Sequence, residues 1–193
     1  MINKEYLEQF EETLKQTLLR KCTSEGLLDG VLLESDDLDD IWTKFAPEYM
    51  ADAVPLLNDY PSVAVAWGGY FGMAVASIWD TDWAKYKDSN LYSALREPRG
   101  FDEMDEYIIE EVLGVKLDSS ENQKLEDLLR SMAQLSISQI RKEQIEAGTA
   151  DAFYIFASAV KVVFKVGASL ELYKRGYSYH KVDMNGLNNQ PVS

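Results

Sequence analysis

Four acidic residues near the start of the chain have the types and the spacing that a metal site requires. Glu8 and Glu11 form an E-x-x-E pair, and Glu34 and Asp37 form an E-x-x-D pair after a gap of 22 residues. Residues three apart on a helix share one face, so each pair can direct two carboxylates toward one cation. Carboxylate oxygens are ligands that Mg²⁺ prefers, and bound magnesium commonly serves phosphate chemistry. The pattern therefore predicts an acidic magnesium site formed by two helices.

This pattern resembles the magnesium site of the all-α nucleotide pyrophosphatases. In that family four acids on two helices hold the metal and the phosphates of the substrate, so the resemblance implies a magnesium-dependent nucleotide phosphohydrolase. The resemblance covers the 30 residues from Glu8 to Asp37, and Glu34 precedes Ser35, the expected N-cap of the second helix. Glu11 falls within an apolar arc of its helix, where an uncompensated carboxylate is costly. The alternative, a solvated face of an acidic chain, stays open.

Histidine and cysteine are too scarce for most other catalytic and metal sites. His180 is the one histidine, which excludes multi-histidine zinc sites, Glu-x-x-His di-iron sites and His-Asp phosphohydrolase sites. Cys22, the one cysteine, lies near the apolar side of its helix and is expected to be a buried structural thiol. No glycine-rich phosphate loop is present, and Trp42 stands where a calcium loop beginning at Asp37 needs glycine.

A second candidate site combines tryptophans with carboxylates. Trp79 and Trp83 are one helical turn apart, and Asp80, Asp82 and Tyr86 lie beside them. Indole faces and carboxylates together form a surface that can receive a cationic side chain of a partner. The alternative is that the tryptophans close one end of the core while the acids face water.

The net charge limits the classes of partner. The chain carries 33 acidic and 19 basic residues, which gives a formal charge of −14. Such a charge repels phosphate backbones and anionic membrane surfaces, so we expect neither nucleic acid nor membrane as a partner. It favours encounters with a basic protein. The opening MINKEYLEQFEE lacks the basic start and apolar run of a signal peptide, and a cytoplasmic location is therefore expected.

The elements that carry these residues are predicted to be helices. Apolar residues recur at helical spacing in residues 3–25, in the segment after Ser35, and in 102–114, 120–148 and 150–175. Pro47 is expected to break or restart the helix after Ser35. Ser120 with Gln123 resembles a capping box at the start of the segment 120–148.

Residues 61–80 contain no charge before Asp80 and allow three interpretations. Their length suits a membrane span, but small residues make them weakly hydrophobic and the flanking charges are acidic. A hairpin at Gly68-Gly69 finds no partner strands elsewhere in the chain. A buried helix fits best, because Val63, Trp67 and Phe71 belong to one apolar face at helical spacing.

A row of small residues on this predicted helix favours close packing. Ala64, Gly68, Gly72 and Ala76 follow one another at intervals of four. Each interior glycine costs about 1 kcal/mol relative to alanine, and close approach of another helix would offset that cost. Residues Gly167 and Ala168 of the last predicted helix are suitable partners.

The sequence therefore predicts an all-α fold, a single-domain bundle of five to seven helices with the helix near 61–80 packed on the helix near 150–175. Residues 1–176 are expected to form this domain and residues 177–193 a polar C-terminal tail. The first functional hypothesis is a non-catalytic acidic protein that binds another protein, of an adaptor, inhibitor or immunity type and without a cofactor. The alternative is the magnesium-dependent nucleotide phosphohydrolase. A small-molecule pocket between helices near the tryptophans is a third possibility.

Overall fold

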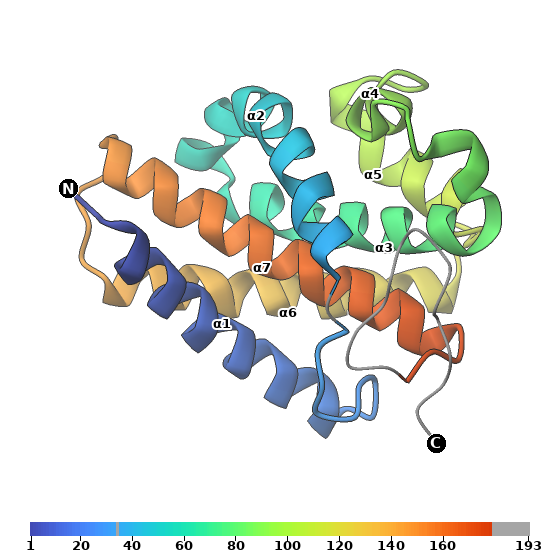
Figure 1. Ribbon diagram of the computed structural model, residues 1–193, viewed down its shortest axis with the longest axis horizontal. Helices are drawn as coiled ribbons and strands as arrows, with labels where there is room; N and C mark the ends of the chain where they lie inside the picture. Colours follow the sequence, from blue (N-terminus) through green and yellow to red (C-terminus); the bar gives the residue numbers. More distant parts are fainter. Residues whose placement is uncertain (34, 179–193) are drawn as a thin grey trace.

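The computed structural model describes residues 1–33 and 35–178, which form seven α-helices and no β-strand (Figure 1). The helices are α1 (Lys4–Ser24), α2 (Asp36–Asp59), α3 (Pro61–Tyr86), α4 (Leu91–Arg96), α5 (Met104–Tyr107), α6 (Ser120–Lys142) and α7 (Ala150–Lys174). A 3-10 turn (Phe101–Glu103) precedes α5 and a π-helical turn (Ile108–Val112) follows it. The predicted all-α bundle is confirmed.

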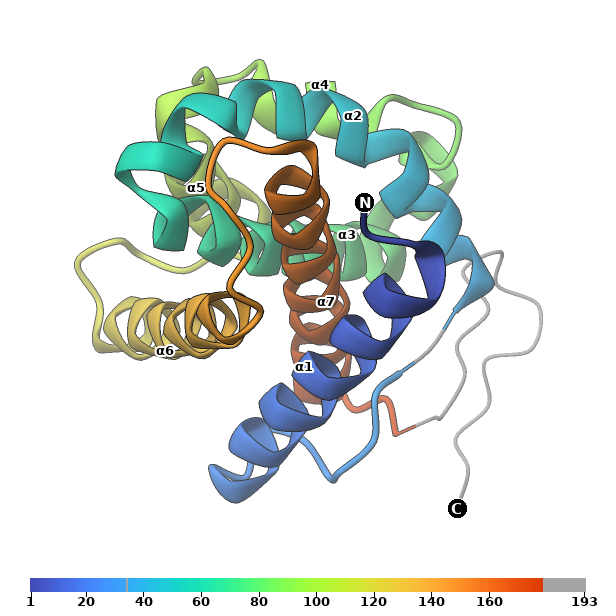
Figure 2. The ribbon, with the colours of Figure 1, turned by 90° about the vertical axis from the view of Figure 1, so that its left-hand side faces the viewer.

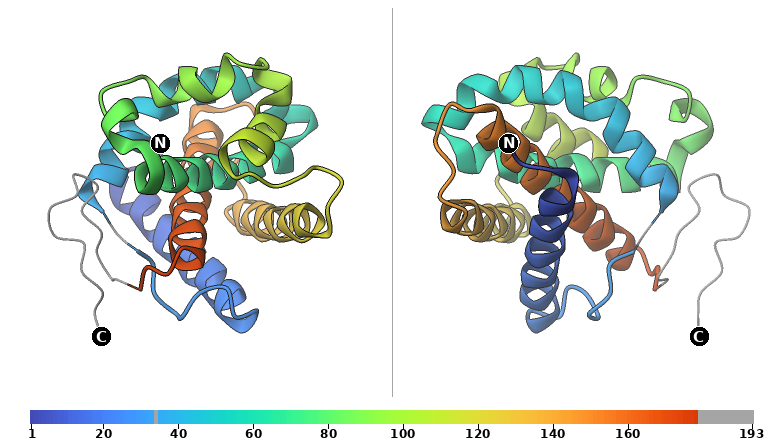
Figure 3. Two further views of the ribbon diagram at one scale, coloured as in Figure 1. Left: turned by 90° about the vertical axis from the view of Figure 1, so that its right-hand side faces the viewer. Right: turned by 60° about the vertical axis from the view of Figure 1, so that its left-hand side comes forward.

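Helices α3 and α7 form the central layer of the bundle. A layer with α2, α4 and α5 covers one side of them, and α1 and α6 cover the other (Figures 1 and 3). In Figure 2, α7 stands in the middle of the surrounding helices. The predicted packing of the helix near 61–80 on the helix near 150–175 is therefore confirmed.

Glycines bring the backbones of α3 and α7 into direct contact. A Cβ atom built on Gly72 would overlap the carbonyl oxygen of Phe164, and one built on Gly167 would overlap the carbonyl oxygen of Gly69. A Cβ on Gly68 would lie 2.8 Å from Cγ1 of Val160. The crossing leaves no room for larger residues at these positions, and dispersion attraction between the closely packed backbones offsets the low helix propensity of glycine.

Both central helices have the length and composition of membrane spans. The most apolar windows of Pro61–Tyr86 and Ala150–Lys174 are 78% and 67% buried within the protein. Burial in the bundle accounts for their apolar composition without a bilayer, because a helix enclosed by other helices is apolar on most sides.

Helix α2 continues without interruption through both of its prolines, so the predicted break at Pro47 is wrong. Pro47 and Pro55 lie on the exposed side of α2, where water can satisfy the carbonyls that proline leaves unpaired, and α2 bends around the core (Figure 2). Aromatic packing holds its inner side, where the ring of Phe45 lies 4.5 Å from that of Phe71. The hydroxyl of Tyr49 donates to the carbonyl of Ala64 in α3.

One predicted helix and the cap of another also differ from the sequence prediction. The predicted helix over 102–114 is divided into the 3-10 turn, α5 and the π-turn. The N-cap of α6 is Ser119, whose hydroxyl accepts from the amide of Asn122, and not Ser120. Ser35 is the N-cap of α2 by position but its side chain makes no capping hydrogen bond.

The last helix ends at Lys174, close to the predicted domain boundary at 176. Of the predicted tail 177–193, Tyr177 and Ser178 belong to the described residues. Tyr177 lies against the core, with its ring 5.1 Å from that of Trp79. Residues 179–193, which include His180, lie outside the described part of the chain.

Candidate functional site: a cleft between α1, α6 and α7

Glu11, the acid that the sequence places in an apolar arc, is paired with two polar residues of α7. Its carboxylate accepts a hydrogen bond from Ser158 at 2.9 Å and pairs with the amine of Lys161 at 3.0 Å. The side chains of Glu11 and Lys161 are 21% and 29% exposed, so the pair is shielded from much of the solvent. Glu11 thus joins α1 to the central helix.

The other predicted magnesium ligands have separate surroundings. Glu8 is exposed and lies 3.4 Å from Lys4. Asp37 is in the first turn of α2 and lines a pocket beside α2 and α4. Glu34 lies outside the described residues. Within residues 1–33 and 35–178, no three histidine, cysteine, aspartate or glutamate side chains are grouped as ligands of one metal ion.

The predicted aromatic and acidic cluster is divided into separate environments by a kink. Asp82 has φ −152° and ψ 36°, which interrupts α3 between Trp79 and Trp83. Trp79 is buried against Tyr177, whereas Trp83 lines a pocket of about 640 Å³ beside α2 and α4. The indole N–H of Trp83 is buried and has no acceptor within the described chain. Asp82 and Tyr86 line a third, smaller cavity. Trp79, Trp83 and the pair Asp82 and Tyr86 therefore lie in three different surroundings.

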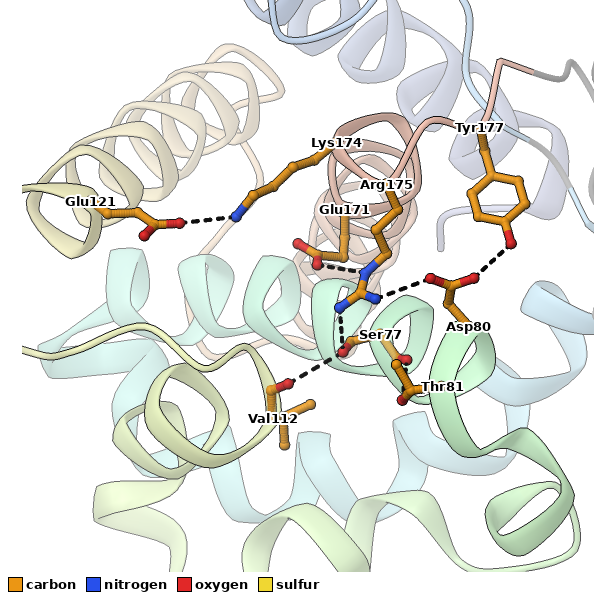
Figure 4. A network of polar contacts seen from close by, with 9 residues as sticks. All are labelled: Ser77, Asp80, Thr81, Val112, Glu121, Glu171, Lys174, Arg175 and Tyr177. Atoms are coloured by element: carbon orange, nitrogen blue, oxygen red, sulfur yellow. Dashed lines mark hydrogen bonds and ion pairs between the residues drawn. The ribbon is translucent and has the colours of Figure 1, made fainter.

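One acid of the predicted cluster, Asp80, is paired with Arg175 of the same chain (Figure 4). Its guanidinium donates to Asp80 at 3.0 Å, to Glu171 at 2.8 Å and to the hydroxyl of Ser77 at 2.8 Å. Tyr177 donates to the second oxygen of Asp80 at 2.6 Å. This network ties the end of α7 to α3.

Next to this network, a cleft of about 790 Å³ opens between the end of α1, the first half of α6 and the end of α7. Helix α1 begins near the end of α6, where Tyr6 donates to Glu143, and the two helices lie at an angle to each other (Figure 1). The cleft lies between the end of α1 and the first half of α6.

The lining of the cleft is largely apolar. Leu27 is 37% exposed there, although burial of a leucine side chain stabilises a folded protein. The apolar lining residues are Leu27, Met73, Leu113, Val115, Leu125, Leu128, Leu170 and Tyr173. The sequence analysis missed this site because its residues come from five separate segments of the chain.

The rim of the cleft carries charges that largely neutralise one another. Lys21 pairs with Glu25 at 2.8 Å, and Lys174 pairs with Glu121 at 3.0 Å (Figure 4). Lys124 is exposed on the rim and forms no ion pair with any described residue. These groups remain in contact with water, so each pair contributes little to stability.

The charged residue that is buried in the lining is Glu171, which is 7% exposed. One of its oxygens accepts from Arg175. The other oxygen accepts no hydrogen bond from the described chain, and Figure 4 shows it directed away from Arg175, toward the side of α6. One sequence signal pointed to it, since Glu171 is the one acid after the first turn of the mostly apolar helix α7.

Comparisons of the chain with protein-family models, with curated proteins and with solved structures give no match. Its function is therefore inferred from the geometry and charge of the cleft.

Proposed function

We propose that this protein is a non-catalytic acidic binding protein, of the adaptor or inhibitor kind, that holds an amphipathic helical segment of another protein in the cleft between α1, α6 and α7. The observation that carries the proposal is the apolar lining of a cleft on the surface of the bundle. Exposed apolar surface that is concave and rimmed by polar groups is typical of interaction sites.

The shape of the cleft favours a helix as its occupant. Its lining comes mainly from three helices, α1, α6 and α7, so a further helix would complete the packing in the way one bundle helix packs on its neighbours. In such helix-in-groove complexes a few apolar side chains at intervals of three and four residues fill the pocket. Leu125 and Leu128 on α6, with Leu170 on α7, would contact those side chains.

Charge supports a basic partner. The chain carries a formal charge of −14, which accelerates encounters with a basic segment and suppresses encounters with acidic ones. The alternative magnesium-dependent phosphohydrolase has weaker support, since Glu8 and Glu11, two of its four predicted ligands, are paired with Lys4 and Lys161.

Photo-crosslinking from within the cleft tests the proposal. The photoreactive residue benzoylphenylalanine replaces Leu125 in the cleft or, as a matched control, Val54, an exposed apolar residue of α2 outside it. Each variant is irradiated in a lysate of the cells that make the protein, and mass spectrometry identifies the crosslinked segment.

Support requires a segment that is crosslinked from position 125 and not from position 54, and that carries apolar residues at helical spacing. Equal crosslinking from both positions, or a segment without that pattern, would refute the proposal, and so would the absence of any product from position 125. Capture of a protein without identification of the segment decides nothing and is not the readout.

A further inference from the structure

We infer that the segment held in the cleft carries a lysine or arginine within its apolar face, and that the cationic group of this residue pairs with Glu171. The inference rests on the proposed function and names the chemistry of the partner. Its starting point is the charge of the network beside the cleft, where the carboxylates of Glu171, which lines the cleft, and Asp80 share the single guanidinium of Arg175.

This network has one negative charge in excess. The side chain of Glu171 is 9% exposed and that of Asp80 is 26% exposed, so water screens the excess charge incompletely. A carboxylate removed from water is stable only when it is paired and hydrogen-bonded. Arg175 satisfies one oxygen of Glu171 and leaves the other without a donor from the described chain.

The lysines nearest in the lining do not supply the missing charge. Lys174 is bound to Glu121, and Lys21 is bound to Glu25. Lys124 lies exposed on the rim, where its amine keeps its hydration. The free oxygen of Glu171 is therefore available to a cation that enters the cleft from outside.

Lysine and arginine match both parts of this site. Their aliphatic stems lie along apolar surface while the charged group reaches a polar partner. Leu125, Leu128 and Leu170 offer that apolar surface, and the largely buried Glu171 offers a carboxylate oxygen as acceptor. A hydrogen bond to a charged acceptor is stronger than one between neutral groups, so the pairing gives the cleft selectivity for basic segments.

Three probes of equal chain length separate the contribution of charge from that of apolar burial. The probes are n-octylammonium, n-octanol and octanoate, each added to the full-length protein. Amide chemical-shift mapping locates the binding site, and titration gives the affinity. In the wild-type protein we expect all binding to map to the cleft, with n-octylammonium bound about tenfold more tightly than n-octanol and octanoate bound most weakly.

Two isosteric variants test whether Glu171 is the cause of this preference. Glu171→Gln keeps an oxygen that accepts from Arg175 and removes the charge, and the preference for n-octylammonium over n-octanol is expected to fall to about twofold or less. Asp127→Asn removes the same charge from the exposed rim of the same cleft and is expected to leave the preference intact. Melting temperatures of both variants establish that they are folded.

The outcomes distinguish failure of this inference from failure of the proposed function. If all three probes bind in the cleft with equal affinity, or if Asp127→Asn abolishes the preference as fully as Glu171→Gln does, the pairing with Glu171 is wrong while the apolar cleft stands. If no probe binds in the cleft, both the pairing and the proposed binding site are wrong. The comparison of the three probes on the wild-type protein holds even if Glu171→Gln does not fold.

Discussion

The α-carbon of Gly72 in α3 lies so close to the carbonyl oxygen of Phe164 in α7 that a methyl group at position 72 would overlap it. This contact fixes the separation of the two central helices, and α1, α2 and α6 pack against them. Because a backbone carbonyl cannot rotate away from a new side chain, the contact tolerates no substitution without movement of a whole helix.

Gly72→Ala and Gly69→Ala are therefore expected to have different effects although both lie in the middle of α3. In a solvated helix each substitution would stabilise by about 1 kcal/mol. At position 72 the overlap with backbone should reverse the sign and cost about 2 to 3 kcal/mol. At position 69 the new methyl meets the flexible end of Leu129 at 2.9 Å, and a small effect is expected. Denaturant unfolding measures both, and equal stability of the two variants would contradict the packing described.

Glu11→Gln should lower the free energy of unfolding by about 1 to 2 kcal/mol, because Lys161 would lose its half-buried partner. Glu8→Gln is the matched control on the same helix, and since Glu8 is exposed its effect should stay below about 0.5 kcal/mol. Thermal and denaturant unfolding of the two variants give the comparison. Similar values for both would show that the Glu11–Lys161 pair does not join α1 to α7.

A nucleotide assay tests whether Glu11 is a ligand of magnesium. With magnesium and a panel of nucleoside triphosphates, we expect the wild-type protein to release neither pyrophosphate nor phosphate, since the pairing of Glu11 with Lys161 uses the carboxylate for structure. Magnesium-dependent turnover that disappears in Glu11→Gln would establish the phosphohydrolase alternative and displace the proposed binding function.

Lowering the pH should weaken the contacts that Asp52 of α2 makes with α4. The hydrogen bond from Tyr92 and the ion pair with Arg96 hold the pKa of Asp52 below its ordinary value. A carboxyl whose pKa is lower in the folded state stabilises the fold above its unfolded pKa of about 4, and this contribution is lost as the pH falls through the folded pKa. Asp52→Asn should therefore flatten the fall of melting temperature below about pH 4, whereas Asp59→Asn, at the exposed end of α2, should not. Parallel curves for wild type and Asp52→Asn would contradict this role.

Cys22 should react with a thiol reagent only after unfolding. The residue is fully buried, and burial raises the pKa of its thiol to about 11, so the reactive thiolate is scarce at neutral pH and cannot be reached. A chromogenic aromatic disulfide added to the native protein should give almost no colour within minutes, and the full stoichiometric signal should follow in denaturant. Rapid reaction under native conditions would show that the end of α1 opens.

The central helices could be predicted from the sequence because their signals are local. Apolar spacing in residues 61–80 and the row from Gly68 to Gly72 describe one helix and the side on which it is approached. The continuity of α2 could not be predicted, since it depends on both prolines facing water while the opposite side packs on Phe71. Local periodicity does not contain that information.

The candidate site was less accessible to sequence reasoning for a similar reason. The Trp79 and Trp83 prediction assumed an unbroken helix, and the backbone change at Asp82 separates the two side chains. The cleft is lined by residues from five separate segments, and no one segment of the sequence specifies how they come together. What the sequence did contain was the isolated acid Glu171 in an apolar helix, a position where an acid requires a partner.

The most direct test of the binding function is the affinity of the crosslinked partner segment for two charge-introducing variants. Leu128→Glu places a carboxylate in the apolar lining of the cleft, and Val54→Glu places one on the exposed face of α2. We predict that the dissociation constant of the segment rises about a hundredfold or more for Leu128→Glu and less than about threefold for Val54→Glu, because burying an unpaired charge against apolar side chains is costly. Unchanged affinity of Leu128→Glu, with the variant folded, would contradict the assignment of the cleft as the binding site.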